Sequence, residues 1–178
     1  MKRGKEEEKI AAASLSVLVC LQMGNTDAAS DAAAAIRPLL AQQMTDAADV
    51  GTAARAACAL AYGVLSFIFS PETETLATMA KLQAIFTAPR TDAELQAECL
   101  EAWSLLLTLV QSNQAVDAVQ TVLANYLEAA LDSTNVDLRI AAGETYAVIY
   151  EVAGEHVEIS DDVLDKFKQL STDTNKSR

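Results

Sequence analysis

Four stretches of the sequence resemble one another at near-constant spacing, and this internal repeat constrains the fold more than any other feature. The clearest markers are Leu18, Tyr62, Trp103 and Tyr146, which lie 44, 41 and 43 residues apart. A repeat of about 40 to 47 residues, made of two or three helices, is typical of HEAT and armadillo solenoids. Each such repeat buries its apolar face against its neighbours. We therefore expect an all-α, armadillo/HEAT-like right-handed helical solenoid of about four repeats and eight main helices.

Two arginines stand at matching positions of the repeat. The stretch from Arg55 to Tyr62 aligns with the stretch from Arg139 to Tyr146, with arginine and tyrosine at the same ends. We expect both arginines to bond neighbouring backbone carbonyls or carboxylates, and the alternative is contact with a partner.

The aromatic markers Tyr62, Trp103 and Tyr146 are expected to be core packing elements, with a base-stacking platform as the alternative. A small residue stands four positions before each of the four repeat markers, Leu18 included. These residues are Ser14, Cys58, Cys99 and Ala142. Close packing of neighbouring helices would favour a small residue there. These positions are therefore interpreted as sites of close helix approach.

Composition favours a single helical domain over the whole chain, 1–178. Apolar residues make up 51% of the sequence and charged residues 21%, with 6 Gly and 3 Pro, so the chain can bury a core without disulfides. The three cysteines, Cys20, Cys58 and Cys99, fall in apolar helical stretches without a C-x-x-C pair. A reduced interior compartment is expected.

The net charge is −12, from 25 acidic and 13 basic residues. This balance argues against a broad nucleic-acid surface, since phosphate binding depends on clustered Lys and Arg. The acids serve either to keep an apolar solenoid soluble or to form an acidic docking face for a basic partner. The apolar run from Ala56 to Phe69 is shorter than the ~20 residues of a membrane span, so we interpret it as a buried helix.

Periodicity and capping residues predict eight helices. Pro38 should kink or restart the second helix, because it cannot donate a backbone hydrogen bond. Ser70 and Pro71 fit an N-cap and first helical position, and Thr91 with Glu94 fits a capping box. Asn135 should cap the seventh helix, and residues 172–178 should fray. The expected helices are Glu7–Met23, Ala28–Met44, Thr52–Phe69, Pro71–Phe86, one from Thr91 to Gln111, Gln114–Leu131, Val136–Val152 and one after Ser160.

Little in the sequence supports catalysis. His156 is the only histidine, and no cysteine or second histidine stands at metal-ligand spacing from it. The sequence has no Gly-rich phosphate loop and no nucleophile elbow. We expect no enzyme activity, no cofactor and no metal, and a surface position for His156.

Several stretches carry a resemblance to a known family. The run from Asn135 to Glu144 (NVDLRIAAGE) resembles the signature of the interferon-related developmental regulator family, and generic HEAT repeats rarely keep such a run. Shorter stretches agree in order: Lys2–Lys5, Arg37–Leu40, Ala53–Leu60 and Ala102–Thr108. The segments Ala28–Ala35 and Asp92–Ala97 depart from the family pattern, as in a divergent member. The resemblance implies a central part of a longer armadillo-like domain.

The resemblance also implies a role in regulation without catalysis. The family is associated with transcriptional co-regulation through co-repressor and deacetylase complexes. It is also associated with translational control by ribosome binding. We therefore expect a cytoplasmic and nuclear protein-interaction scaffold, and the alternative is a ribosome-associated translational regulator that uses local basic contacts.

The second helix of each pair usually lines the concave face of a helical solenoid, which is the common binding surface. Polar residues on the second, fourth, sixth and eighth helices are thus the candidate partner contacts. They form a mixture that favours a protein partner: Arg37, Gln42, Lys81, Gln83, Gln120, Asn125, Lys166 and Lys168.

Overall fold

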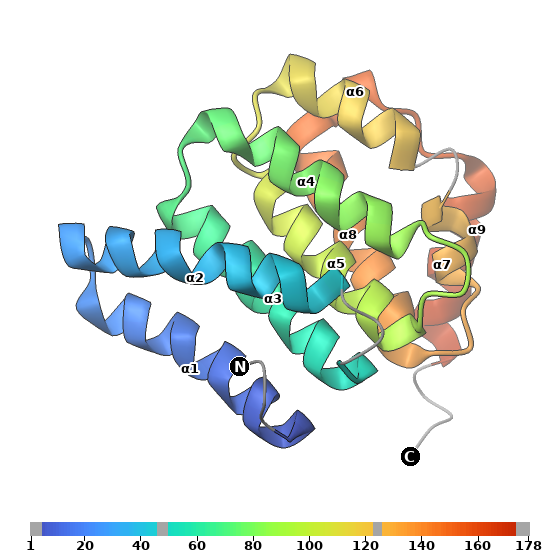
Figure 1. Cartoon of the computed structure of the whole chain (residues 1–178). Coiled ribbons are helices and arrows are strands. Elements are labelled where there is room, and N and C mark those ends of the chain that lie inside the picture. The colour runs from blue at the N-terminus through green and yellow to red at the C-terminus, as the bar shows by residue number, and fades with distance from the viewer. Residues whose placement is uncertain (1–4, 46–49, 123–125, 174–178) are drawn as a thin grey trace.

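The helices of this chain form four consecutive groups in a computed structural model that describes residues 5–45, 50–122 and 126–173 (Figure 1). A short 3-10 helix, η2, connects the last two α-helices. The bounds are α1 Glu6–Met23, α2 Asp27–Thr45, α3 Thr52–Phe69, α4 Glu72–Phe86, α5 Ala93–Leu107, α6 Ser112–Val122, α7 Glu128–Leu131, α8 Val136–Ala153, η2 Gly154–His156 and α9 Asp161–Asp173.

The first helix of each group packs on the first helix of the next, so that α1 contacts α3, α3 contacts α5 and α5 contacts α8. The second helices cover this row, with α2 packed on α3 and α4 packed on α5. In the view of Figure 1, α2 and α4 lie in front of α3 and α5. This two-layer stack, in which repeats contact their sequence neighbours, confirms the predicted helical-repeat solenoid.

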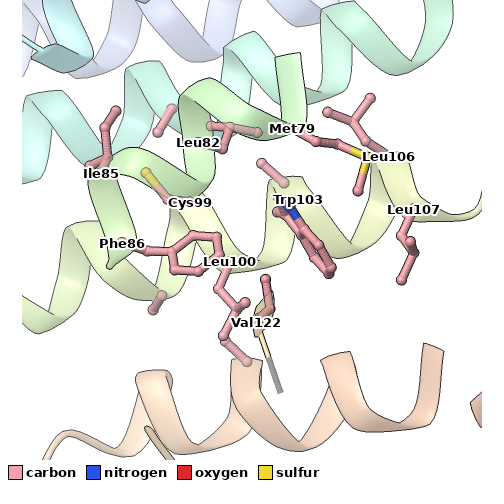
Figure 2. Packing of buried hydrophobic residues seen from close by; sticks show 14 of the residues in the cluster. Met79, Leu82, Ile85, Phe86, Cys99, Leu100, Trp103, Leu106, Leu107 and Val122 are labelled. Atoms are coloured by element: carbon pink, nitrogen blue, oxygen red, sulfur yellow. The ribbon is translucent and has the colours of Figure 1, made fainter. Parts of the chain in front are cut away.

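The core lies between the two layers and is rich in leucine and alanine. Around Trp103 of α5, Figure 2 shows Met79, Leu82 and Phe86 of α4 and Val122 of α6. Trp103 and Phe86 are fully buried, and their rings meet edge to face with centroids 6.3 Å apart. Such aromatic pairs contribute about 0.5–1.5 kcal/mol beyond their burial.

Helix α3 is enclosed on several sides, since α1, α2 and α5 all pack against it. It is also long and apolar enough, by length and composition alone, to pass as a membrane span. Half of it is buried inside the fold. This burial is what a core helix shows, in agreement with the predicted buried helix.

The predicted restart of the helix at Pro38 is wrong, because α2 continues through it as one helix from Asp27 to Thr45. The kink that was the other possibility stays a prediction. Pro38 and Ala34, whose carbonyl loses its usual donor, are both exposed. Water can therefore satisfy that carbonyl, and the proline ring meets no packed neighbour. The short-plus-long helix arrangement of an armadillo repeat is absent from this described segment.

The predicted capping box at the start of α5 is also wrong. The Thr91 hydroxyl donates instead to the Ile85 carbonyl at 3.0 Å, which closes the end of α4. Asp92 precedes the helix and accepts a hydrogen bond from the Thr52 hydroxyl at 2.8 Å. The two side chains thus tie α5 to its neighbours rather than capping its own first turn.

The other helix ends follow the sequence to within a few residues. Pro71 is the cap of α4 rather than its first residue, and α5 ends at Leu107, before the predicted Gln111. The single helix predicted from Gln114 to Leu131 is described as α6 and α7, with residues 123–125 outside the described part. α9 continues to Asp173, and residues 174–178 lie outside it as well.

Asn135 caps α8 as predicted. Its side-chain oxygen accepts a hydrogen bond from the backbone N–H of Leu138 at 2.9 Å. This bond satisfies one of the free donors of the first turn. α8 then runs from Val136 to Ala153, one residue beyond the predicted end.

Candidate interaction surfaces

Arg37, a candidate partner contact on α2, forms an ion pair within the chain. Its guanidinium Nη2 lies 2.6 Å from a carboxylate oxygen of Glu74 on α4. The Arg37 side chain is 16% exposed and that of Glu74 is 49% exposed. The pair links two second helices, so partner contact by Arg37 would have to compete with Glu74.

The two candidate lysines of α9 are also paired. Lys166 Nζ lies 2.7 Å from Asp132 and 3.3 Å from Glu128, which tethers α9 to the α7 region. The hydrogen bond to Asp132 raises the pKa of Lys166. Lys168 pairs with Asp165 at 2.7 Å.

The remaining candidates are spread over three helices of the second layer. Gln42 on α2, Lys81 on α4 and Gln120 on α6 are exposed, whereas Gln83 on α4 is half-buried. Asn125 lies outside the described residues. The structure places these side chains on the predicted helices, and their use as a binding face stays a prediction.

The repeated arginines have the structural role that we expected. Arg55 Nε donates to the carbonyl of Met44 at 3.0 Å, and Arg139 Nη1 donates to the carbonyl of Ser133 at 2.6 Å. Gln96 stands seven residues before Trp103, as Arg55 does before Tyr62, and its side-chain amide donates to the Phe86 carbonyl at 3.0 Å. Each bond joins a first helix to the segment that precedes it.

The aromatic repeat markers are core residues. Tyr62 is 3% exposed, Trp103 is fully buried and Tyr146 is 4% exposed. Tyr146 meets Phe167 of α9 edge to face, with ring centroids 5.5 Å apart. The corresponding Leu18 is 61% exposed, because α3 is the one first helix that packs beside α1 in the described part of the chain.

A groove that sequence reasoning missed runs along the first-helix layer. It has a volume of about 460 Å³ and lies between α1 and α5, with α3 as its floor. Small residues on α3 leave this space open because they cannot fill the gap between the two walls. We name it the α1–α5 groove, lined by Ile10, Ser14, Val17 and Leu18 on α1, by Ala53, Ala56, Ala57, Leu60, Ala61 and Val64 on α3, and by Glu94 and Glu98 on α5.

The two glutamates in the α5 wall of the groove belong to a longer row of carboxylates. We call this row the acidic strip and define it as Glu94, Glu98, Glu101 and Asp137. The four side chains line an adjoining hollow of about 240 Å³ that reaches α8. Glu94 is exposed at the start of α5. Glu98 and Glu101 are half-buried, because α8 packs against α5 beside them.

Glu98 is the most perturbed carboxylate of the strip. Its Oε2 atom is buried and has no hydrogen-bond partner among the residues that the structure describes. Burial, followed by the negative charges of Glu101, Glu94 and Asp137, raises the pKa of Glu98 from 4.5 to about 7. Burial and the charges of Glu144 and Asp137 also raise the pKa of Glu101. Among the described residues, the groove wall thus holds a half-buried carboxylate, Glu98, whose charged neighbours are acidic.

A second apolar hollow, of about 660 Å³, lies between α8 and α9. Its rim includes Tyr150, which is 64% exposed, and Leu164, which is 43% exposed. It carries one acidic side chain, Glu151. It therefore differs from the α1–α5 groove in having no strip of neighbouring carboxylates.

His156 is exposed at the end of η2. Within residues 5–45, 50–122 and 126–173, no group of three or more His, Cys, Asp or Glu side chains is placed to hold a metal ion. Cys20, Cys58 and Cys99 are buried free thiols. They act as small packing residues in the described core.

Comparison with known proteins agrees with the resemblance carried by the sequence. The family model "Interferon-related developmental regulator (IFRD)" matches residues 1–178. Interferon-related developmental regulator 1 of Sus scrofa is 30% identical over 199 residues, covering 100% of this chain and 43% of its own length. The Homo sapiens regulator 1 and the Mus musculus regulator 2 are each 29% identical over 196 residues, with 43% and 44% of their lengths covered. The chain spans less than half the length of these relatives, and it belongs to the interferon-related developmental regulator family.

Proposed function

We propose that the chain is a non-catalytic protein-interaction scaffold in gene regulation, working in the cytoplasm and the nucleus. The observation that carries this proposal is a helical-repeat stack of a regulator family whose first-helix layer keeps an open apolar groove. Solenoids of this kind present extended surfaces to partner proteins. Co-repressor and deacetylase complexes are the partners that the family resemblance suggests.

The alternative function is a ribosome-associated translational regulator that acts through local basic contacts. It has weaker support, because Arg37, Lys166 and Lys168 are held in ion pairs with carboxylates of the chain. The net charge of −12 also opposes approach to phosphate-rich surfaces.

A pulldown with the tagged chain from nuclease-treated and untreated lysate separates the two functions. The scaffold proposal expects co-repressor or deacetylase components to be recovered equally from both lysates. Recovery of ribosomal proteins that disappears after nuclease treatment, with no such components, would instead establish the alternative. The tag alone, on the same beads, is the matched control.

A further inference from the structure

The α1–α5 groove has the shape of a seat for one helix. Two helices form its walls, and the alanines Ala53, Ala57 and Ala61 keep its floor on α3 low. Residues on one α-helical face of a partner recur at every third or fourth position, and such a stripe fits an apolar groove between two helices. A volume of about 460 Å³ holds a few aliphatic side chains.

The α1 wall offers apolar surface to a partner. Leu18 lines the groove and is 61% exposed, and Leu15, Val19 and Leu21 of the same helix are exposed beside it. An exposed apolar patch of this kind costs free energy in water, which a partner's apolar face would recover.

The opposite wall determines the charge of the partner. In the part of the chain that the structure describes, the charged groups that act on Glu98 are all acidic, and its Oε2 atom has no hydrogen-bond partner. A Lys or Arg of a docked helix would supply both the missing donor and the missing positive charge. Nucleic-acid phosphates would be repelled there, and so would a second copy of this chain, which carries the same strip and a charge of −12.

We propose that the α1–α5 groove binds a basic amphipathic helix of a partner protein, with the partner's apolar stripe over α3 and its Lys or Arg side chains against Glu94 and Glu98. The inference rests on the scaffold function and names the class of partner segment. Complementary charge fixes the orientation of such a helix, while the apolar stripe supplies most of the binding free energy.

The test uses a synthetic helical peptide of about four turns, with leucines at helical spacing and Lys or Arg along one edge of the leucine stripe. Fluorescence anisotropy with the whole chain should show saturable binding. A peptide with Glu in place of Lys and Arg should not bind, and neither should a scrambled peptide of the same composition. Binding of the basic peptide should weaken as salt concentration rises.

Two changes in the chain probe the two walls. Glu94→Gln with Glu98→Gln should weaken binding of the basic peptide about tenfold, and Ala57→Trp should abolish it by filling the floor. Glu72→Gln with Glu158→Gln, which removes two exposed charges elsewhere, is the matched control and should leave binding unchanged. Tyr150→Ser at the α8–α9 hollow should also leave it unchanged.

Loss of binding through misfolding is distinguishable, because removing the unpaired Glu98 charge should raise the melting temperature while peptide binding falls. The inference is overturned if the scrambled peptide binds equally, if Ala57→Trp binds normally, or if sedimentation shows a dimer that excludes the peptide. The scaffold function would still hold after any of these three outcomes, provided that the Ala57→Trp chain recovers regulatory complexes in the lysate pulldown. A pulldown with the unmodified chain that recovers no regulatory complex would contradict the scaffold function instead.

Discussion

Gly63 of α3 lies directly against Ala102 of α5, so that a methyl group added at Gly63 would overlap Ala102 Cβ and come 3.1 Å from its Cα. Both residues are buried. The two central first helices therefore approach at backbone distance, and packing of this density leaves no volume to spare.

Gly63→Ala should lower the free energy of unfolding by about 1–3 kcal/mol, through overpacking at the α3–α5 contact. Helix propensity alone favours alanine over glycine by about 1 kcal/mol, so a loss of stability identifies the contact as its cause. Thermal unfolding followed by circular dichroism measures the change. Gly143→Ala in α8 is the matched control, because its added methyl would meet only Phe167 Cε1 at 3.6 Å. A control that loses as much stability as Gly63→Ala would contradict this explanation.

Arg55→Ala should destabilise the chain by about 1–3 kcal/mol, because the Met44 carbonyl at the end of α2 loses its charged donor. Gln96→Ala should cost about 0.5–1.5 kcal/mol, since its bond to the Phe86 carbonyl involves no charge. Urea denaturation gives both values. Lys81→Ala, at an exposed position of α4, should change stability by less than about 0.5 kcal/mol. Equal effects of all three changes would argue against a role of these bonds in joining repeats.

Glu98→Gln should stabilise the chain at neutral and basic pH. The folded carboxyl keeps its proton up to about pH 7, whereas an ordinary carboxyl releases it near 4.5. The free energy of unfolding of the unmodified chain should therefore fall as pH rises between these values. After allowance for solvent screening, we expect a gain of about 1–2 kcal/mol for the variant above pH 7, and none below about pH 4. Denaturation across this pH range tests it, and a gain that is equal at every pH would exclude the titration of Glu98 as its source.

Cys58 and Cys99 should be unreactive while the chain is folded. Burial raises the pKa of Cys58 to about 11, and burial also raises the pKa of Cys99 to about 12. Since the thiolate is the reactive form, labelling of these two by a thiol reagent near pH 8 should be at least about a hundredfold slower than that of a free cysteine. In denaturant all three thiols should react at once. Rapid labelling of Cys99 without denaturant would show that the core around Trp103 opens readily.

Much of the architecture was predictable because it depends on periodic local features. The spacing of Tyr62, Trp103 and Tyr146 predicted the stack, and Asn135 predicted the start of α8. Local rules failed where a neighbouring element decided the outcome. The Thr91 hydroxyl donates to the end of α4 rather than capping the start of α5. Pro38 is exposed, so water can bond the backbone carbonyl that lacks its helical donor, and α2 continues.

The groove could not be predicted from periodicity because three helices define it. One signal was present, since the α3 residues that line the groove include alanines at positions 53, 56, 57 and 61. The half-burial of Glu98 was hidden for a related reason. The packing of α8 on α5 half-buries this position, and the sequence of α5 alone does not reveal that contact.

The packing of first helix on first helix gives the two groove walls unequal anchorage. α5 has a first helix on each side, α3 and α8, whereas α1 has α3 alone and otherwise contacts α2. Local opening follows the elements with the fewest buried contacts, so we expect amide hydrogens of α1 to exchange with solvent earlier than those of α5. We therefore expect the two walls of the α1–α5 groove to differ in mobility. Its width should adjust on the α1 side, at Leu18, while the spacing of Glu94 and Glu98 on α5 stays constant.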